Sequence, residues 1–146
     1  MDSGFLTDLD VRLKEGSDGI WQVVSPLKYW SALLNCQIVV PPWFETAVPD
    51  TAGPEPAFFE TDFASVPRVP FVYDAWGARA HREATLHDYL YRCDSIPVAT
   101  YSQANRVFLE AMTSTGKRWC IRYPMYLGVV IGGWTAYHKH KVQDRL

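Results

Sequence analysis

Cysteine is scarce in this sequence. Its three cysteines, Cys36, Cys93 and Cys120, lie far apart in the chain and form no CxxC pair. A disulfide scaffold needs several cysteines that pair, and a zinc ribbon needs CxxC pairs, so three scattered cysteines exclude both. We therefore expect reduced thiols and a fold that depends on its hydrophobic core, which 146 residues are enough to form without cross-links or metals.

A strong excess of charge is absent as well. The formal net charge is −2, so no large basic field attracts nucleic acid, and we expect no nucleic-acid partner. The length is that of one ordinary domain, and we predict a single domain over residues 1–146. Residues 138–146, which include Lys139, Lys141 and Arg145, are locally basic, and we interpret them as a solvated tail.

We expect neither a leader nor a membrane-spanning run from this sequence. Residues 1–6 do not show a basic segment followed by an apolar one, so we expect a chain kept in the cytoplasm or packed into a particle assembled there. The uncharged run over residues 123–137 is shorter than the roughly 20 residues that a spanning helix needs. We predict a core helix there, and contact with a membrane or the cell envelope stays open as the alternative.

Short strands are predicted in the first forty residues. Apolar and polar residues alternate over residues 9–13, and an apolar run at 20–24 follows a turn-forming cluster at 15–19, which predicts a β-hairpin. Residues 36–40 are rich in β-branched side chains and predict a further strand.

Proline punctuates the middle of the chain. Residues 46–57 contain three prolines and a glycine, and we interpret them as an inserted surface loop without regular structure. Residues 62–70 contain Pro67 and Pro70, which disfavour helix at the residues before them. We expect this second segment to be an ordered connection that presents side chains to a ligand.

The second half of the chain has helical periodicity. Helices are predicted over residues 79–93 and 101–115, the latter opened by a capping box of Thr100 and Gln103. A third helix is predicted over residues 124–137, since proline suits a first helical turn. The fold class is therefore α+β, with a small antiparallel sheet in the N-terminal half followed by three packed helices.

One face of the first predicted helix gathers polar side chains. At about 100° per residue, Ala84, His87, Asp88 and Tyr91 fall on one side of the helix, and the alanine leaves room above it. Carboxylate oxygens bind divalent cations, and a neutral imidazole binds metals or acts as a general base. Tyr91, one turn after His87, is placed to hold either partner by a hydrogen bond.

The proline-rich connection adds further candidates. Asp62 is a second carboxylate, Ser65 offers a hydroxyl, and Arg68 offers a guanidinium that suits a carboxylate or phosphate. We predict Ser65 and Arg68 as substrate-binding residues.

Two interpretations of the candidate residues stay open. In the first, His87, Asp88 and Tyr91 are catalytic, and Asp62, Asp88 and His87 hold a metal; the cofactor is unassigned, with a divalent metal as the candidate. In the second, His87 and Asp88 bond the backbone of the connection and pin it to the helix, as buried polar residues commonly do.

Three segments resemble one family. They are residues 61–68 (TDFASVPR), 84–91 (ATLHDYLY) and 102–112 (SQANRVFLEAM), and together they resemble the phage and prophage family called domain of unknown function 1353, over about residues 20–137. The resemblance implies a virion or host-entry context, because members occur among tail and lysis genes. We predict a tailed-phage virion component of the tail tip, baseplate or neck, with other virion proteins as partners. The alternative is a metal-dependent hydrolase that acts on cell-envelope material during entry or lysis.

This sequence departs from the family pattern at two places. Residues 46–57 intervene where the family runs from a Val-Pro strand end directly into the Thr-Asp motif. The family places Ala-Asp on the second helix, where this chain has Ala104 and Asn105. We expect Asn105, on the polar edge of the second helix's buried stripe, to look into the same space as His87. An amide forms hydrogen bonds but is a weak metal ligand, so this departure implies a weakened site.

A looser likeness concerns the pattern His-Asp-x-x-Tyr. On a helix, with an aspartate from a neighbouring helix, it resembles the active site of the secreted phospholipases, where the histidine activates water and the aspartate holds calcium. The cysteine framework and the glycine-rich calcium loop of those enzymes are absent from this sequence. We interpret the likeness as convergent geometry rather than kinship.

Overall fold

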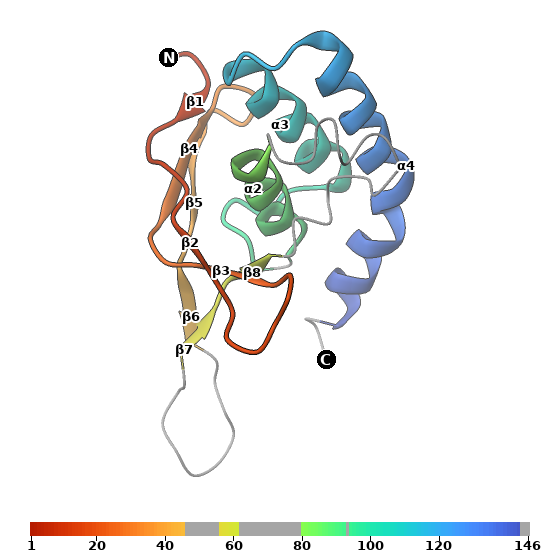
Figure 1. Ribbon diagram of the computed structural model, residues 1–146. Helices are drawn as coiled ribbons and strands as arrows, with labels where there is room; N and C mark the ends of the chain where they lie inside the picture. The colour runs from red at the N-terminus through yellow and green to blue at the C-terminus, as the bar shows by residue number, and fades with distance from the viewer. Residues whose placement is uncertain (46–55, 62–79, 93, 144–146) are drawn as a thin grey trace.

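Strands come first along the chain and helices after them. The computed structural model describes residues 1–45, 56–61, 80–92 and 94–143. Within these residues the helices are α2 (His81–Tyr91), α3 (Tyr101–Ser114) and α4 (Trp119–Gln143). The strands lie on one side of the molecule and α4 on the other, with α2 between them (Figure 1). The predicted α+β class is confirmed.

The strands of the described residues are short and antiparallel. They are β1 (Gly4–Phe5), β2 (Val11–Leu13), β3 (Trp21–Val23), β4 (Leu27–Ser31), β5 (Cys36–Val40), β6 (Trp43–Glu45), β7 (Pro56–Phe58) and β8 (Glu60–Thr61). They form two three-stranded sheets, β1-β4-β5 and β2-β3-β8, and the two-stranded ribbon β6-β7. The predicted small sheet is therefore divided into three parts.

The predicted hairpin and the predicted strand at residues 36–40 are both present. Val11 pairs with Val23 across β2 and β3, as the alternation over residues 9–13 indicated. The strand β5 pairs with β4, which the sequence pattern did not predict, in a register that sets Leu27 opposite Val40. Both of these side chains are buried, and they anchor the sheet in the core.

The predicted C-terminal bound of the inserted loop, residue 57, was wrong. Pro56 and Ala57 belong to β7, where Glu45 of β6 pairs with Pro56. Proline is tolerated here because it is the first residue of an edge strand, where its missing N–H interrupts no ladder. Residues 46–55, the rest of that prediction, lie outside the described residues.

The predicted bounds of the third helix were also wrong. α4 begins at Trp119, and Pro124 lies in its second turn rather than its first. The helix continues to Gln143, so most of the predicted basic tail is helical. No glycine or proline follows Gly133, and each added residue of a growing helix contributes one more hydrogen bond. Both facts favour this extension.

Helix α2 is the centre of the fold. Its buried residues are Glu83, Ala84, Thr85, Leu86, His87, Tyr89, Leu90 and Tyr91. The strands and α3 form one hydrophobic cluster against it, and α3 with α4 forms a second. In Figure 1, α2 and α3 lie side by side between the strands and α4. Because α2 is enclosed on nearly all sides, its polar side chains need partners within the protein.

Candidate functional site

His87 lies at the contact between α2 and α3. Its side chain is 1% exposed and packs between two rings, with centroids 4.1 Å from Tyr91 and 5.0 Å from Phe108. Tyr91 follows His87 by one helical turn, which explains why both side chains share a face of α2. The imidazole Nε2 lies 2.8 Å from Oδ1 of Asn105 on α3. The expectation that Asn105 looks into the same space as His87 is confirmed.

One oxygen atom of Asn105 organises this cluster. The Tyr91 hydroxyl donates to Asn105 Oδ1 over 2.7 Å, so the same oxygen contacts both Tyr91 and His87. An amide oxygen only accepts hydrogen bonds, and His87 Nε2 therefore carries the imidazole proton. The lone pair of the ring is then on Nδ1. The protein selects one tautomer of a neutral histidine, as sites that use histidine as a base commonly do.

The Asn105 amide is incompletely satisfied. The side chain is 2% exposed, and its Nδ2 has no hydrogen-bond partner among the described residues. Burial of an unpaired donor costs about 1–3 kcal/mol. Most buried polar groups in native proteins are paired, so an exception points to strain, a ligand or a functional role.

Burial also sets the charge state of the two rings. It lowers the pKa of His87 to about 4, although the hydrogen bond with Asn105 acts in the opposite direction. Burial raises the pKa of Tyr91, which therefore keeps its proton and remains a donor. The cluster is accordingly uncharged at neutral pH: a neutral imidazole, a neutral phenol and an amide.

Asp88 contacts a different element from its neighbour His87. It is half-buried and accepts a hydrogen bond of 2.6 Å from Oγ1 of Thr61, the last residue of β8. Thr61 itself is buried. This contact joins α2 to the strand that leads into the predicted connection at residues 62–70. The helix stripe thus faces α3 through His87 and β8 through Asp88.

The remaining predicted residues can be placed only in part. Asp62, Ser65 and Arg68 lie outside the described residues. In the part of the chain that the structure describes, no group of three or more His, Cys, Asp or Glu residues is arranged to hold a metal ion. Of the predicted metal ligands, His87 and Asp88 are described, and they point to different neighbours.

Gly133 is a site residue that the sequence reasoning missed. A Cβ atom built on it would lie 2.5 Å from the Tyr91 hydroxyl, so the tyrosine occupies the space that any other residue at 133 would need. Tyr137 of α4 also packs edge-on against Tyr91, with ring centroids 5.3 Å apart. A glycine inside an apolar helix was the available signal, because it often marks a close approach.

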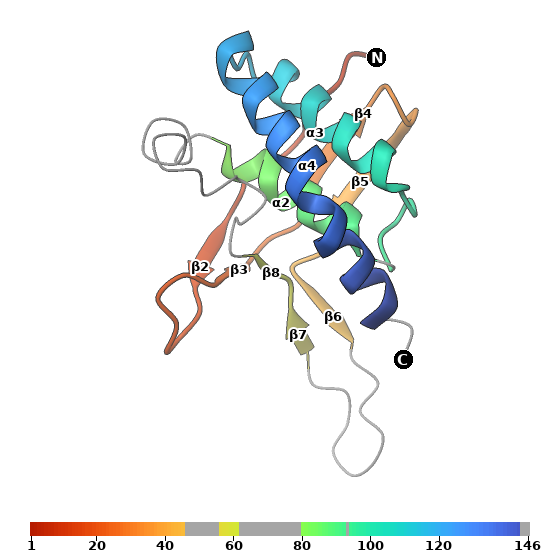
Figure 2. The same cartoon turned by 90° about the vertical axis from the view of Figure 1, so that its right-hand side faces the viewer.

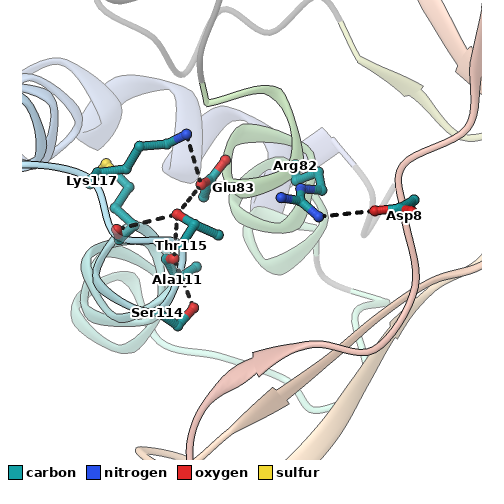
Figure 3. Close-up of polar contacts among 8 residues, drawn as sticks. Asp8, Arg82, Glu83, Ala111, Ser114, Thr115 and Lys117 are labelled. Atoms are coloured by element: carbon teal, nitrogen blue, oxygen red, sulfur yellow. Dashed lines mark hydrogen bonds and ion pairs between the residues drawn. The ribbon is translucent and has the colours of Figure 1, made fainter.

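α2 buries a second polar side chain, Glu83. The carboxylate is 1% exposed, accepts a hydrogen bond of 2.5 Å from the Thr115 hydroxyl and lies 3.6 Å from Nζ of Lys117. Both partners come from the end of α3 and the turn that follows it (Figure 3). This cluster fixes the start of α2 against the end of α3.

Comparison with known families adds one decisive observation. The family model described as "Protein of unknown function (DUF1353)" matches residues 54–129, which is more than half of the chain. The chain belongs to this family. The DUF1353 match includes α2, α3, His87 and Asn105, together with the predicted connection at residues 62–70. No curated protein and no solved structure matches the chain.

Proposed function

We propose that the His87 cluster is a hydrolytic centre in which neutral His87 acts as a general base. The observation that carries this proposal is the single oxygen of Asn105, which lies within hydrogen-bond distance of both Nε2 and the Tyr91 hydroxyl. A base whose second nitrogen is held by an orienting group is the arrangement that nucleophile activation needs. Asn105 stands where the phospholipase-like pattern has an aspartate from a neighbouring helix.

The chemical step follows from these positions. The His87 ring takes a proton from a water molecule, whose oxygen forms a bond to the acyl or phosphoryl centre of the substrate. The bond to the leaving group then breaks, and the leaving oxygen takes the proton from His87. Asn105 and Tyr91 are positioning residues, because they act on the ring rather than on the substrate.

Asp88 has a separate role in the proposal. Among the residues that the structure describes, Asp88 is the one whose carboxylate would contact a divalent cation, and the Thr61 hydroxyl orients that carboxylate. Such a cation would polarise the substrate oxygen. Asp62 as a second ligand, and Ser65 and Arg68 as substrate-binding residues, remain predictions.

Asn105 makes His87 a weaker base than an aspartate would. An amide carries no charge to stabilise the imidazolium that forms in the reaction, and burial keeps the pKa of His87 low. A general base works best with a pKa near the working pH. We therefore expect slow hydrolysis by the natural protein.

The experiment supplies two classes of cell-envelope material, phospholipid vesicles and peptidoglycan, with calcium, magnesium or a chelator. We expect product from one class, and a loss of about 10²–10⁴-fold in rate for His87→Gln. The matched control is His81→Gln, since His81 lies on the same helix and is exposed. Absence of product from both materials, or an unchanged rate in folded His87→Gln, would refute the proposal.

The predicted place of the protein is tested separately. From the family resemblance we propose a virion component at the tail tip, baseplate or neck, bound to other virion proteins. Mass spectrometry of purified particles should then detect the chain at a stoichiometric copy number, and its absence from the particles would refute this placement without affecting the hydrolytic proposal.

A further inference from the structure

Helix α4 exposes a continuous apolar face. Its inward side chains Met125 and Val129 are buried against α2 and α3. Its outward side carries large apolar side chains with high exposed fractions: Trp119 70%, Tyr123 47%, Leu127 53%, Ile131 79% and Trp134 56%. Their spacings of four and three residues place them on one face of the helix. Figure 2 shows α4 nearest the viewer, in front of α2 and α3.

Such a face is unusual on a protein surface. Single exposed apolar residues are common, but a contiguous row of large ones marks a contact with another molecule or with a membrane. Between Trp119 and Trp134 the helix is about 22 Å long. Two aromatic residues stand at the start of this row, one at its end, and aliphatic residues lie between them. We call these five residues the α4 stripe.

The charged residues of α4 have one sign. α4 contains no Asp or Glu, while Arg122, Lys139 and Lys141 lie within it and Arg118 directly precedes it. Arg118 is exposed, and the Arg122 guanidinium lies 5.5 Å from the centre of the Tyr123 ring. Cationic residues thus occur near both ends of the stripe.

This distribution of cationic residues decides whether a second copy of the chain or an anionic surface covers the α4 stripe. Arg122, Lys139 and Lys141 belong to α4, which contains no carboxylate, so a parallel or an antiparallel pair of α4 helices would bring only cationic residues together. Neither arrangement offers a carboxylate from α4 to offset the repulsion. An anionic surface complements the same charges without any rearrangement.

A lipid surface also fits the form of the stripe. No helix among the described residues is long and apolar enough to cross a membrane. A helix with tryptophan and aliphatic residues on one face and cations beside them lies in the plane of the interface instead. We propose that the α4 stripe binds the surface of an anionic membrane, with Leu127 and Ile131 entering the acyl boundary and Arg118 and Arg122 contacting headgroups.

The experiment measures flotation of the full chain with vesicles of phosphatidylcholine alone or mixed equally with phosphatidylglycerol. We expect binding to the mixed vesicles that weakens with salt, and at least a tenfold loss for the double variant Leu127→Gln, Ile131→Gln. The matched control is Ile96→Gln, Val98→Gln, because these residues are 76% and 71% exposed but lie outside α4. The control should bind like the natural protein.

The charge contribution is tested on the same vesicles. Arg118→Glu should lower the affinity for mixed vesicles by more than about fivefold, since one cation near an anionic surface contributes about that factor. Three results would overturn the proposal. They are an absence of binding to mixed vesicles, equal binding to both vesicle types, and a dimer in light scattering that Ile131→Gln converts to monomer, which would identify a second copy as the occupant.

Discussion

Helix α2 buries two polar clusters one turn apart, and they are built differently. At Glu83, a buried carboxylate meets a hydroxyl from Thr115 and an ammonium group from Lys117 (Figure 3). At His87, a neutral ring and a phenol share one oxygen of Asn105, whose amide nitrogen has no partner among the described residues. The first cluster pairs its charge, whereas the second carries no charge and leaves a donor unpaired.

The difference separates a structural role from a functional one. Pairing a buried charge holds two elements together, because loss of either partner leaves the other uncompensated. An unpaired donor costs stability, and such costs are concentrated at sites that bind or react. We therefore propose that the Glu83 cluster serves stability and the His87 cluster serves chemistry, and four changes test this proposed assignment.

The largest effect concerns the pH dependence of stability. The pKa of His87 is about 4 in the folded protein and about 6.5 in the unfolded chain. Between these values the unfolded chain binds more protons, so the free energy of unfolding falls as pH drops from 6.5 to 4, and the full contribution returns above 6.5. The expected loss across this window is about 3 kcal/mol.

Urea unfolding at a series of pH values measures this loss. The variant His87→Gln lacks the titrating ring, and its stability should fall less steeply below pH 6.5 than that of the natural protein. All other titrating groups are shared by the two proteins, so their contributions cancel in the difference. Identical pH profiles would mean that the folded protein does not keep this ring neutral.

Sequence signals predicted the parts of the fold that depend on near neighbours. The capping box of α3 has both expected hydrogen bonds, because Thr100 and Gln103 are only three residues apart. The strand β4 was missed because its last inward position is Ser31, which breaks the apolar pattern. The Ser31 hydroxyl donates a hydrogen bond to Glu110 of α3, 79 residues further along the chain. No local sequence pattern reveals that partner.

The same limit applies to the candidate site. Helical periodicity predicts that His87 and Tyr91 share one face of their helix and that Asn105 lies on the edge of the buried face of the next helix. Each of these predictions depends only on residue spacing within one helix. The contact of Asp88 with Thr61 depends on where β8 ends, and the contact of Tyr91 with Gly133 depends on the path of α4. Pro124 obscures that path, because proline is typical of the first turn of a helix, whereas here it lies in the second turn.

The second change gives the His87 cluster a charge. Asn105→Asp places a carboxylate against Nε2, which favours the imidazolium and raises the pKa of His87. We expect hydrolysis at neutral pH to become about tenfold faster, with the rate falling off at a higher pH than in the natural protein on acidification. A fully apolar counterpart, Asn105→Leu, removes both the acceptor and the unpaired nitrogen.

The rate of hydrolysis and the free energy of unfolding are measured together for both Asn105 variants. Asn105→Leu should abolish hydrolysis and cost about 1–3 kcal/mol of stability, because the Tyr91 hydroxyl and His87 Nε2 lose their acceptor while the unpaired amide nitrogen is removed with it. If Asn105→Asp instead unfolds the protein and Asn105→Leu lowers stability by much more than this, the Asn105 oxygen serves the fold and the proposed assignment of the two clusters is reversed.

The third change acts on the Glu83 cluster. Lys117→Met leaves the buried carboxylate with Thr115 alone, and the expected loss of stability is about 1–3 kcal/mol. The rate of hydrolysis per folded molecule should be unchanged. Arg82→Met is the matched control, since Arg82 neighbours Glu83 but pairs with the exposed Asp8, and its effect should be much smaller (Figure 3). If folded Lys117→Met loses hydrolytic activity, the Glu83 cluster also contributes to function and the two clusters do not have separate roles.

The smallest effect distinguishes two adjacent glycines of α4. In Gly133→Ala, the new methyl group meets the Tyr91 hydroxyl, and the strain should exceed the helix propensity gained, for a net loss of about 1 kcal/mol. In Gly132→Ala, nothing lies within 4 Å of the methyl group, so the same substitution should stabilise the helix by up to about 1 kcal/mol. Adding Tyr91→Phe to Gly133→Ala removes the colliding hydroxyl and should recover part of the loss in stability, but not the rate of hydrolysis. Equal gains from both alanines would show that Tyr91 reaches Asn105 without needing the space that Gly133 leaves.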